Sequence, residues 1–293
     1  MILLTLATAC SSPQFTQQWL IDRTRVLAVR AEPPEPAPGA VVTLSALVVD
    51  PDGDPEVAWV ACSLPVDCPD YAAVQELAAA DTGAMTSDEL AAWQADATAA
   101  GFLGFGVGLS PTLLVLGAGP PDGGPDTGLP DTGFPDTGSA PRSSELTVVL
   151  DAIPAGKGLA DVTLGDAEAT EIGTKSISVA DSETPNQNPT VTSLSIDGES
   201  EATVSRGEAV SLEATLADGS AESYADADGE TQTEEPTVSY YVSGGTLVQS
   251  IVAADDAEVS WTAPESSGTV RLWAIVRDGR GGTDWLVETV TVE

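Results

Sequence analysis

The chain has 293 residues, with 10 Lys and Arg against 46 Asp and Glu and no histidine, which gives a formal net charge of -36. This charge repels nucleic-acid phosphates and excludes DNA or RNA as a partner. The absence of histidine excludes Ser-His-Asp and Cys-His catalysis and histidine-ligated zinc or haem. Hydrophobic residues make up 42% of the chain, so there is enough apolar material for two domains with their own cores.

The N-terminal stretch MILLTLATAC is a short apolar run that ends in small residues and a cysteine. It resembles a bacterial lipoprotein signal peptide, in which a small-residue lipobox precedes a cysteine that is acylated. The resemblance implies that residues 1–10 hold the signal and lipobox and that a lipid on Cys10 attaches the protein to a membrane. Two features depart from the usual pattern, since Ala7 stands where leucine is common and no Lys or Arg precedes the run. The alternative is a buried free cysteine at this position.

A polar spacer at 11–23 leads into short apolar, β-branched segments separated by Gly, Pro and Asp. This succession is typical of an antiparallel β-sandwich rather than a fold with alternating strands and helices. We therefore predict a mainly β protein whose first Ig-like sandwich covers 24–181. Its expected strands are 24–31, 41–49, 56–62, 112–117, 145–154, 158–166 and 171–181.

Two insertions interrupt the first sandwich, and the first is the alanine-rich segment 71–100. Thr86 and Glu89 form a capping box there, which predicts one or two short helices. The uncharged run 97–121 has the length of a membrane span. Its six glycines, its internal Pro111 and its lack of basic flanks favour a Gly-rich loop followed by a strand instead.

The second insertion, 118–143, contains the triplet Asp-Thr-Gly three times in the stretch PPDGGPDTGLPDTGFPDTG. The same triplet holds the catalytic carboxylates of aspartic proteases, which need two such acids fixed by flanking strands. Here each Asp follows a proline, and no apolar strand surrounds the repeat. We interpret the repeat as a disordered, exposed and acidic tether without a catalytic role.

Cys62 and Cys68 remain as a pair if Cys10 carries the lipid. The exported location implied by the lipoprotein resemblance favours a disulfide between them. The alternative is two reduced cysteines that act as small apolar residues at the end of a strand. Two cysteines in a chain without histidine make a poor zinc site, so we predict no metal at this pair.

Residues 182–190 are polar and contain proline, which is typical of an interdomain linker. The strands that follow match a second Ig-like sandwich over 191–293. Alternation in one of them predicts a core-facing set, namely Val270, Leu272, Ala274 and Val276. The expected strands are 190–196, 209–217, 237–243, 246–252, 257–263, 269–278 and 284–292.

Three segments carry a resemblance to a known class of proteins: VLAVRAEPPEPAPGAVVTLSALVVDPDGD, NQNPTV and SWTAPESSGTVRLWAIVRDGRGGT. They resemble envelope lipoproteins of Gram-negative bacteria with tandem Ig-like domains of the PKD or cadherin-like kind. The resemblance covers both sandwiches but neither insertion. It implies a non-catalytic, lipid-anchored protein of the outer membrane that binds an unknown protein or glycan or acts as a spacer. The alternatives are a carbohydrate hydrolase with paired carboxylates and a structural subunit of an envelope assembly.

Two sets of alternating acids around glycine turns are similar to parts of calcium loops, which supply about six to eight oxygen ligands. The sets are Asp50, Asp52 and Asp54 in DPDGDPE, and Asp226, Asp228 and Glu230 in YADADGE. The alternative is that Asp and Gly only form turns here, with side-chain to backbone hydrogen bonds. Calcium is therefore a candidate ligand of either loop, and we predict no other cofactor.

A possible interaction face lies opposite the core-facing set of strand 269–278. Arg271, Trp273 and Ile275 alternate on that face, and Trp285 lies across the following hairpin. An exposed pair of tryptophans beside an arginine is suited to binding sugar or protein. The alternative is that the neighbouring domain or a loop covers these side chains.

Overall fold

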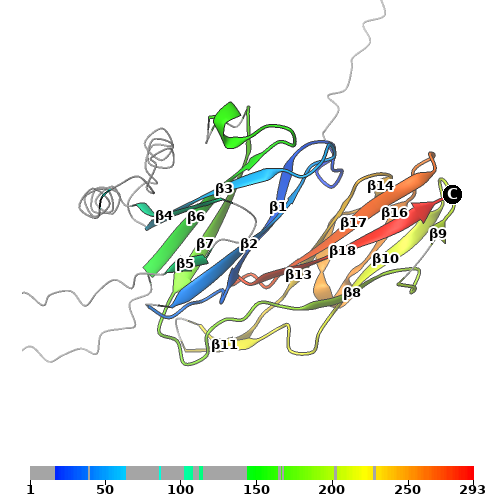
Figure 1. Cartoon of the computed structure of the whole chain (residues 1–293). Helices are drawn as coiled ribbons and strands as arrows, with labels where there is room; N and C mark the ends of the chain where they lie inside the picture. Colours follow the sequence, from blue (N-terminus) through cyan, green and yellow to red (C-terminus); the bar gives the residue numbers. More distant parts are fainter. Residues whose placement is uncertain are drawn as a thin grey trace, which may run out of the picture.

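The structure is a computed structural model that describes residues 17–38, 40–63, 86, 102–107, 112–114, 144–163, 166, 168–200, 203–226 and 229–293. These residues form mainly β-strands, arranged as two sandwiches that lie side by side (Figure 1). The mainly β fold class predicted from the sequence is confirmed. The predicted helical insert at 71–100, apart from Thr86, and the repeat at 118–143 lie outside the described residues.

The first sandwich consists of two antiparallel sheets, with strand orders β1-β2-β5 and β4-β3-β6-β7. Alternation along its strands gathers Val, Leu, Ile and Ala side chains in a core around Trp59, which is 2% exposed. The strands are β1 (Arg25–Glu32), β2 (Val41–Val49), β3 (Glu56–Ser63), β4 (Phe102–Val107), β5 (Thr112–Leu114), β6 (Ser144–Ile153) and β7 (Glu171–Val179).

The second sandwich has sheets ordered β14-β16-β10-β8 and β15-β13-β17-β18-β9, with β9 parallel to β18. Its core surrounds Trp261 and Tyr240 and contains the whole core-facing set predicted on β17. The strands are β8 (Val191–Ile196), β9 (Thr203–Val204), β10 (Ala209–Leu216), β13 (Thr237–Val242), β14 (Thr246–Leu247), β15 (Ile251–Ala253), β16 (Glu258–Thr262), β17 (Gly268–Arg277) and β18 (Thr283–Val292). A separate hairpin pairs β11 (Ser223–Ala225) with β12 (Thr231–Thr233).

The predicted strand at 158–166 is wrong, because a 3-10 helix, η1 (Leu159–Asp161), lies in this place. The Gly158 N–H donates to the Asp161 carboxylate at 2.9 Å, and the Asp161 N–H donates to the Gly158 carbonyl at 2.9 Å. These local hydrogen bonds turn the chain and compete with a strand ladder.

A β-bulge in β1 sets how the two sandwiches meet. The pairing with β2 shifts between Val26 and Ala28, so that Leu27 is an extra residue. A bulge re-aims side chains, and here Leu27 and Ala28 both face the second sandwich, while Val29 belongs to the first core. Consequently β1 is packed on both sides, and it supplies one wall of the joint between the sandwiches.

Candidate functional site

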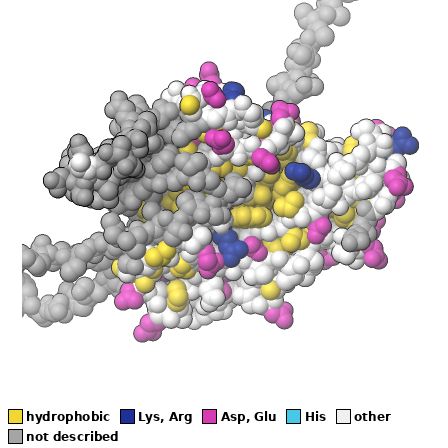
Figure 2. Space-filling model, in the orientation of Figure 1, with side chains coloured by type: hydrophobic (Ala, Val, Ile, Leu, Met, Phe, Trp, Pro, Cys, Tyr) yellow, Lys and Arg dark blue, Asp and Glu magenta, His cyan; other side chains and the backbone are white. Residues whose placement is uncertain are grey.

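The joint between the sandwiches has an apolar centre built from three stretches of chain. Ile21 precedes β1, Leu27 and Ala28 come from β1, and Trp273 and Ile275 come from β17. All five are at most 5% exposed. Figure 2 shows hydrophobic side chains gathered in the middle of the molecule, with acidic side chains around the periphery. This apolar contact removes Trp273 and Ile275, on the outer face of β17, from water.

The interaction face predicted on β17 is therefore wrong as an exposed surface. Trp273 is 4% exposed and Ile275 is fully buried, because the first sandwich and the segment before β1 cover them. Trp285 lies opposite Ile275 on β18 and is partly buried in the same cluster. Arg271 is exposed, beyond the edge of the contact. The joint, rather than a free surface, accounts for this aromatic pair.

The predicted linker is fixed to both sandwiches by two asparagines. The Asn188 amide donates to the Ala31 carbonyl of β1 at 2.8 Å, and its oxygen accepts the Thr283 N–H of β18 at 2.8 Å. The Asn186 amide donates to Asp278 at 2.9 Å, and its backbone N–H donates to Glu35 at 2.7 Å. The linker thus holds the two sandwiches at defined positions.

Three arginines reinforce the joint. Arg30 of β1 pairs with Asp284 of β18 at 2.8 Å. The guanidinium of Arg277 donates to the Leu27 carbonyl at 2.7 Å. Arg280 pairs with Glu35 of the first sandwich at 3.4 Å and also with Glu234 and the Tyr224 ring of the second. Planar guanidinium groups suit such multiple contacts, and the chain commits a large share of its few cations here.

The β17–β18 hairpin is shaped around the buried carboxylate of Asp278, which is 3% exposed. Its oxygens accept N–H groups from Arg280, Gly281 and Gly282 at 2.7–3.0 Å. Gly281 has a φ of 116°, which side chains rarely adopt, and a Cβ on Gly282 would lie 2.0 Å from the Asp278 carboxylate. Glycine is required at both positions, so the hairpin has a fixed shape against the first sandwich.

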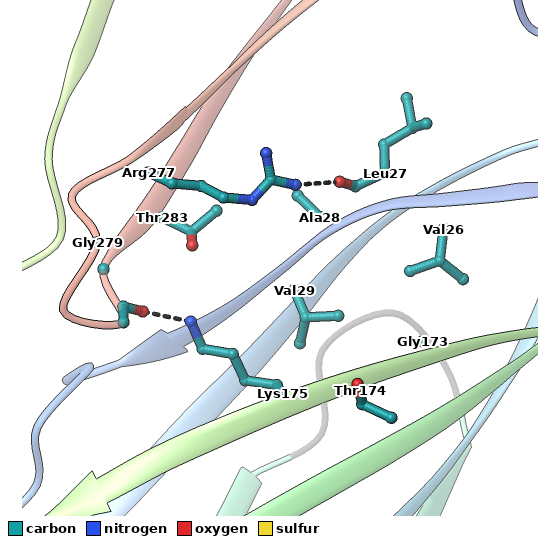
Figure 3. A pocket seen from close by; sticks show the side chains of 12 residues that line it. Val26, Leu27, Ala28, Val29, Gly173, Thr174, Lys175, Arg277, Gly279 and Thr283 are labelled. Atoms are coloured by element: carbon teal, nitrogen blue, oxygen red, sulfur yellow. Dashed lines mark hydrogen bonds between the residues drawn. The ribbon is translucent and has the colours of Figure 1, made fainter. Parts of the chain in front are cut away.

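A cleft of ≈ 340 Å³ opens between β1, β7 and this hairpin (Figure 3). The β1 stretch from Val26 to Val29 gives the cleft its apolar side, and Thr174 and Lys175 of β7 also line it. The Lys175 ammonium donates to the Gly281 carbonyl, and Arg277 reaches across to β1. Figure 3 shows the two cations extending across the same gap from opposite sandwiches. The cleft therefore combines an apolar wall with two positive charges.

Burial lowers the pKa of Lys175 from 10.5 to about 8. Asp278 raises this pKa, and the positive charge of Arg277 lowers it further. Lys175 is thus a desolvated ammonium that the surroundings compensate only in part. A perturbed cation in a cleft is a mark of a functional site, and it is also found in structural ion networks.

The segment before β1 is attached to the second sandwich. The Ile21 N–H donates to the Val242 carbonyl at 2.9 Å, and the Val242 N–H donates to the Trp19 carbonyl at 3.0 Å. Leu20 forms a parallel bridge with Val242, and Trp19 and Leu20 pack against the second core. We call residues 17–21 the N-terminal arm. The predicted spacer at 11–23 is wrong in this part, because the arm is packed against the fold.

In the first candidate calcium loop, the Asp50 carboxylate accepts hydrogen bonds from neighbouring protein groups. Asp50 accepts from the Thr24 hydroxyl and from the N–H groups of Asp52 and Ala155. Burial raises the pKa of Asp50, but these hydrogen bonds lower it by more, so that the pKa lies below its usual value. No group of three or more acids or cysteines is placed to hold a metal among the described residues, which include Asp50, Asp52 and Asp54. This loop is a turn in which Asp50 ties three segments together.

The second candidate calcium loop is described in part. The Asp226 carboxylate accepts the Glu230 N–H at 2.9 Å and the Gln232 amide at 2.9 Å, which shapes the turn between β11 and β12. Asp228 lies outside the described residues. Calcium at this loop stays a prediction.

The predicted lipid and disulfide sites also stay predictions. Cys10 and Cys68 lie outside the described residues, and Cys62 is placed in β3, where it pairs with Thr147 of β6. Helices that could cross a membrane were not found in the part of the chain that the structure describes.

No protein-family model matches the chain, and no curated protein matches it. Among solved structures, it is similar to the D00-D0 domain of Intimin, at 12% identity over 91% of this chain and 100% of that chain, with a TM-score of 0.25. It is also similar to the two tandem V-type regions of VCBP3, a chitin binding protein, at 11% identity over 92% of this chain and 100% of that chain, with a TM-score of 0.29. Because these TM-scores are low, we assign the two sandwiches from the strand order of this chain alone.

Proposed function

We propose that this chain is a non-catalytic module of the cell envelope, anchored by a lipid on Cys10, in which two Ig-like sandwiches act as one unit for binding or spacing. The observation that carries this proposal is the joint, where an apolar cluster, the linker asparagines and three arginines connect the sandwiches. Contacting domains move relative to each other by default unless their interface is large and apolar. A fixed joint sets the distance and angle between the two ends of the molecule.

A fixed geometry is useful for presenting a surface to a partner, because no conformational entropy is lost in ordering the domains when the partner binds. The partner class that fits the sequence resemblance is a protein or a glycan outside the cell, and the net charge of -36 disfavours nucleic acid and anionic lipid surfaces. The lipid would then supply the membrane contact that the protein surface does not.

The anchor is tested by expressing the full chain in a Gram-negative host and separating detergent and aqueous phases. We expect the mature protein to begin at Cys10, to carry the mass of a diacylglycerol and to enter the detergent phase. The variant Cys10→Ser should keep its leader and lose the lipid mass. If the chain with its native Cys10 shows no added lipid mass, the proposed lipid anchor is wrong, whatever the sandwiches bind.

A further inference from the structure

We propose that the cleft between the two sandwiches binds a small monocarboxylate with a short apolar body, whose carboxylate pairs with Lys175 and whose body lies on β1. This inference goes beyond the proposed envelope role and does not depend on the lipid. It combines the shape of the cleft, the chemistry of its walls and the positive groups that line it.

The size of the cleft selects a small ligand. Its volume of ≈ 340 Å³ is near the lower end of known ligand pockets, which span roughly 300–1,000 Å³. The cleft is lined by residues of both sandwiches, and junctions between domains are preferred positions for such pockets. A ligand held there would contact β1, β7 and the β17–β18 hairpin.

The donors in the cleft select an anion. An ammonium has three N–H donors, and within the described residues Lys175 uses one of them on the Gly281 carbonyl. Arg277 donates one N–H from each terminal nitrogen, to the Ser239 hydroxyl and to the Leu27 carbonyl, and a guanidinium has five N–H donors in all. Lys175 can therefore bind a carboxylate directly, and Arg277 adds a second positive charge and further donors nearby.

Asp278 does not take the place of the proposed carboxylate ligand. Asp278 lies outside the lining of the cleft, and both of its oxygens accept hydrogen bonds from the hairpin or from Asn186. Its charge stabilises the Lys175 ammonium at a distance without satisfying the remaining donors. A bound carboxylate would compensate the desolvated ammonium of Lys175.

The remaining walls limit the ligand to one charge and an apolar body. The β1 stretch from Val26 to Val29 lines the cleft, and because Val26 is half-buried and the other three are at most 8% exposed, the apolar surface that it offers is small. The net charge of -36 repels polyanions such as phosphorylated compounds, and this repulsion is weakest for a single negative charge. A branched short-chain acid such as isovalerate fits both requirements and serves as the probe.

The test uses the full chain labelled with ¹³C and ¹⁵N in lysine, because the chain has two lysines, Lys157 and Lys175. Lys157 is exposed in the loop after β6 and serves as the internal control. We expect isovalerate, titrated to about 10 mM, to shift the Lys175 side-chain signals in a saturable way and to leave those of Lys157 unchanged. The neutral isostere isovaleramide should not shift either set.

Calorimetric titration of variants completes the test. Lys175→Met should reduce the affinity for isovalerate at least tenfold, and Lys157→Met should leave it unchanged. Val26→Phe keeps both cations and adds bulk to the apolar side of the cleft, so it should also abolish binding, and it decides the question if Lys175→Met disturbs the joint. Unchanged binding in Val26→Phe, equal shifts with isovaleramide, or no saturable shift of Lys175 would each overturn the proposal.

Discussion

Two tryptophans on neighbouring regions of the second sandwich serve different purposes. Trp261 of β16 is fully buried, and its neighbours in the core come mainly from the second sandwich itself. Trp273 of β17 is also buried, but it packs against the N-terminal arm and β1 of the first sandwich. The first tryptophan stabilises a domain, and the second connects two domains. Burial alone therefore does not tell which level of structure a side chain maintains.

The two regions also differ in how polar groups are used. Around Trp261, the indole N–H donates to the Gly244 carbonyl at 3.0 Å, the Tyr240 hydroxyl is hydrogen-bonded to the backbone of Ala214 and Ala257, and the other core side chains are apolar. Around Trp273, the apolar centre is bordered by ion pairs and by linker amides. A border of charged and polar contacts gives the joint a specific geometry, because each pair fixes one orientation. The predictions below test this contrast.

Trp261→Ala should have the largest effect. It would remove a fully buried side chain and leave a cavity that the rigid sandwich cannot close, at a cost of about 3–5 kcal/mol. In urea titrations monitored by circular dichroism, we expect the cooperative unfolding transition of the second sandwich to be lost. A near-native unfolding midpoint would show that this core is not the main source of the sandwich's stability.

Trp273→Ala should cost less, about 2–3 kcal/mol, because the two sandwiches can separate and water can replace the lost contact instead of a cavity. The characteristic result is a change in cooperativity. Differential scanning calorimetry should show one transition for the unmodified chain and two for the variant. A single, uniformly lowered transition would mean that Trp273 belongs to a domain core after all.

Arg30→Ala should have a smaller effect, about 1 kcal/mol, because the Arg30–Asp284 pair is partly buried and joins β1 to β18 at 2.8 Å. The matched control is Arg23→Ala, whose pair with Asp22 is exposed and 3.7 Å long. We expect the control to change the free energy of unfolding by less than about 0.5 kcal/mol. Equal effects for the two variants would argue against a specific ionic border at the joint.

A further prediction is a pH dependence of stability. The pKa of Lys175 is lowered from 10.5 to about 8, so between these values the unfolded chain binds more protons than the folded chain and stability rises with pH. The pKa of Tyr240 is raised from 10.0 to about 12, chiefly by burial, so stability falls again above about pH 10. We expect a local maximum near pH 10 in urea midpoints.

Lys175→Met should remove the rise between pH 8 and 10, because methionine does not titrate. Lys157→Met should retain it. If the rise persists in the first variant, the titration belongs to another group, and Lys175 is more solvated than its position at the joint indicates.

The inner face of β17 could be predicted from the sequence, whereas its outer face could not. Alternation identifies which residues share a face, and Val270 and Leu272 are in the core as expected. Alternation does not say what lies over the other face, so the sequence leaves open both an exposed Trp273 and one that the neighbouring domain covers. The cover comes from residues about 250 positions earlier in the chain, and no local pattern reports that contact.

The cleft was missed for a related reason. Lys175 lies mid-strand in β7 and is one of two lysines in an acidic chain, which is the one sequence signal that could have drawn attention to it. Its importance depends on the β17–β18 hairpin and on the bulge at Leu27. Asn186 and Asn188 lie in the segment predicted as a linker, but their hydrogen-bond partners depend on the docked geometry of both sandwiches.

The N-terminal arm determines how mechanical load enters the molecule. Tension applied ahead of residue 17 reaches the Val242 pairing and the packed Trp19 before it reaches β1. The second sandwich, which follows the first in sequence, is thus the first to resist a pull from the N-terminal side. Under force, the arm would detach from β13 before either sandwich unfolds. Only its few residues would then be added to the extended part of the chain, and both folds would remain intact.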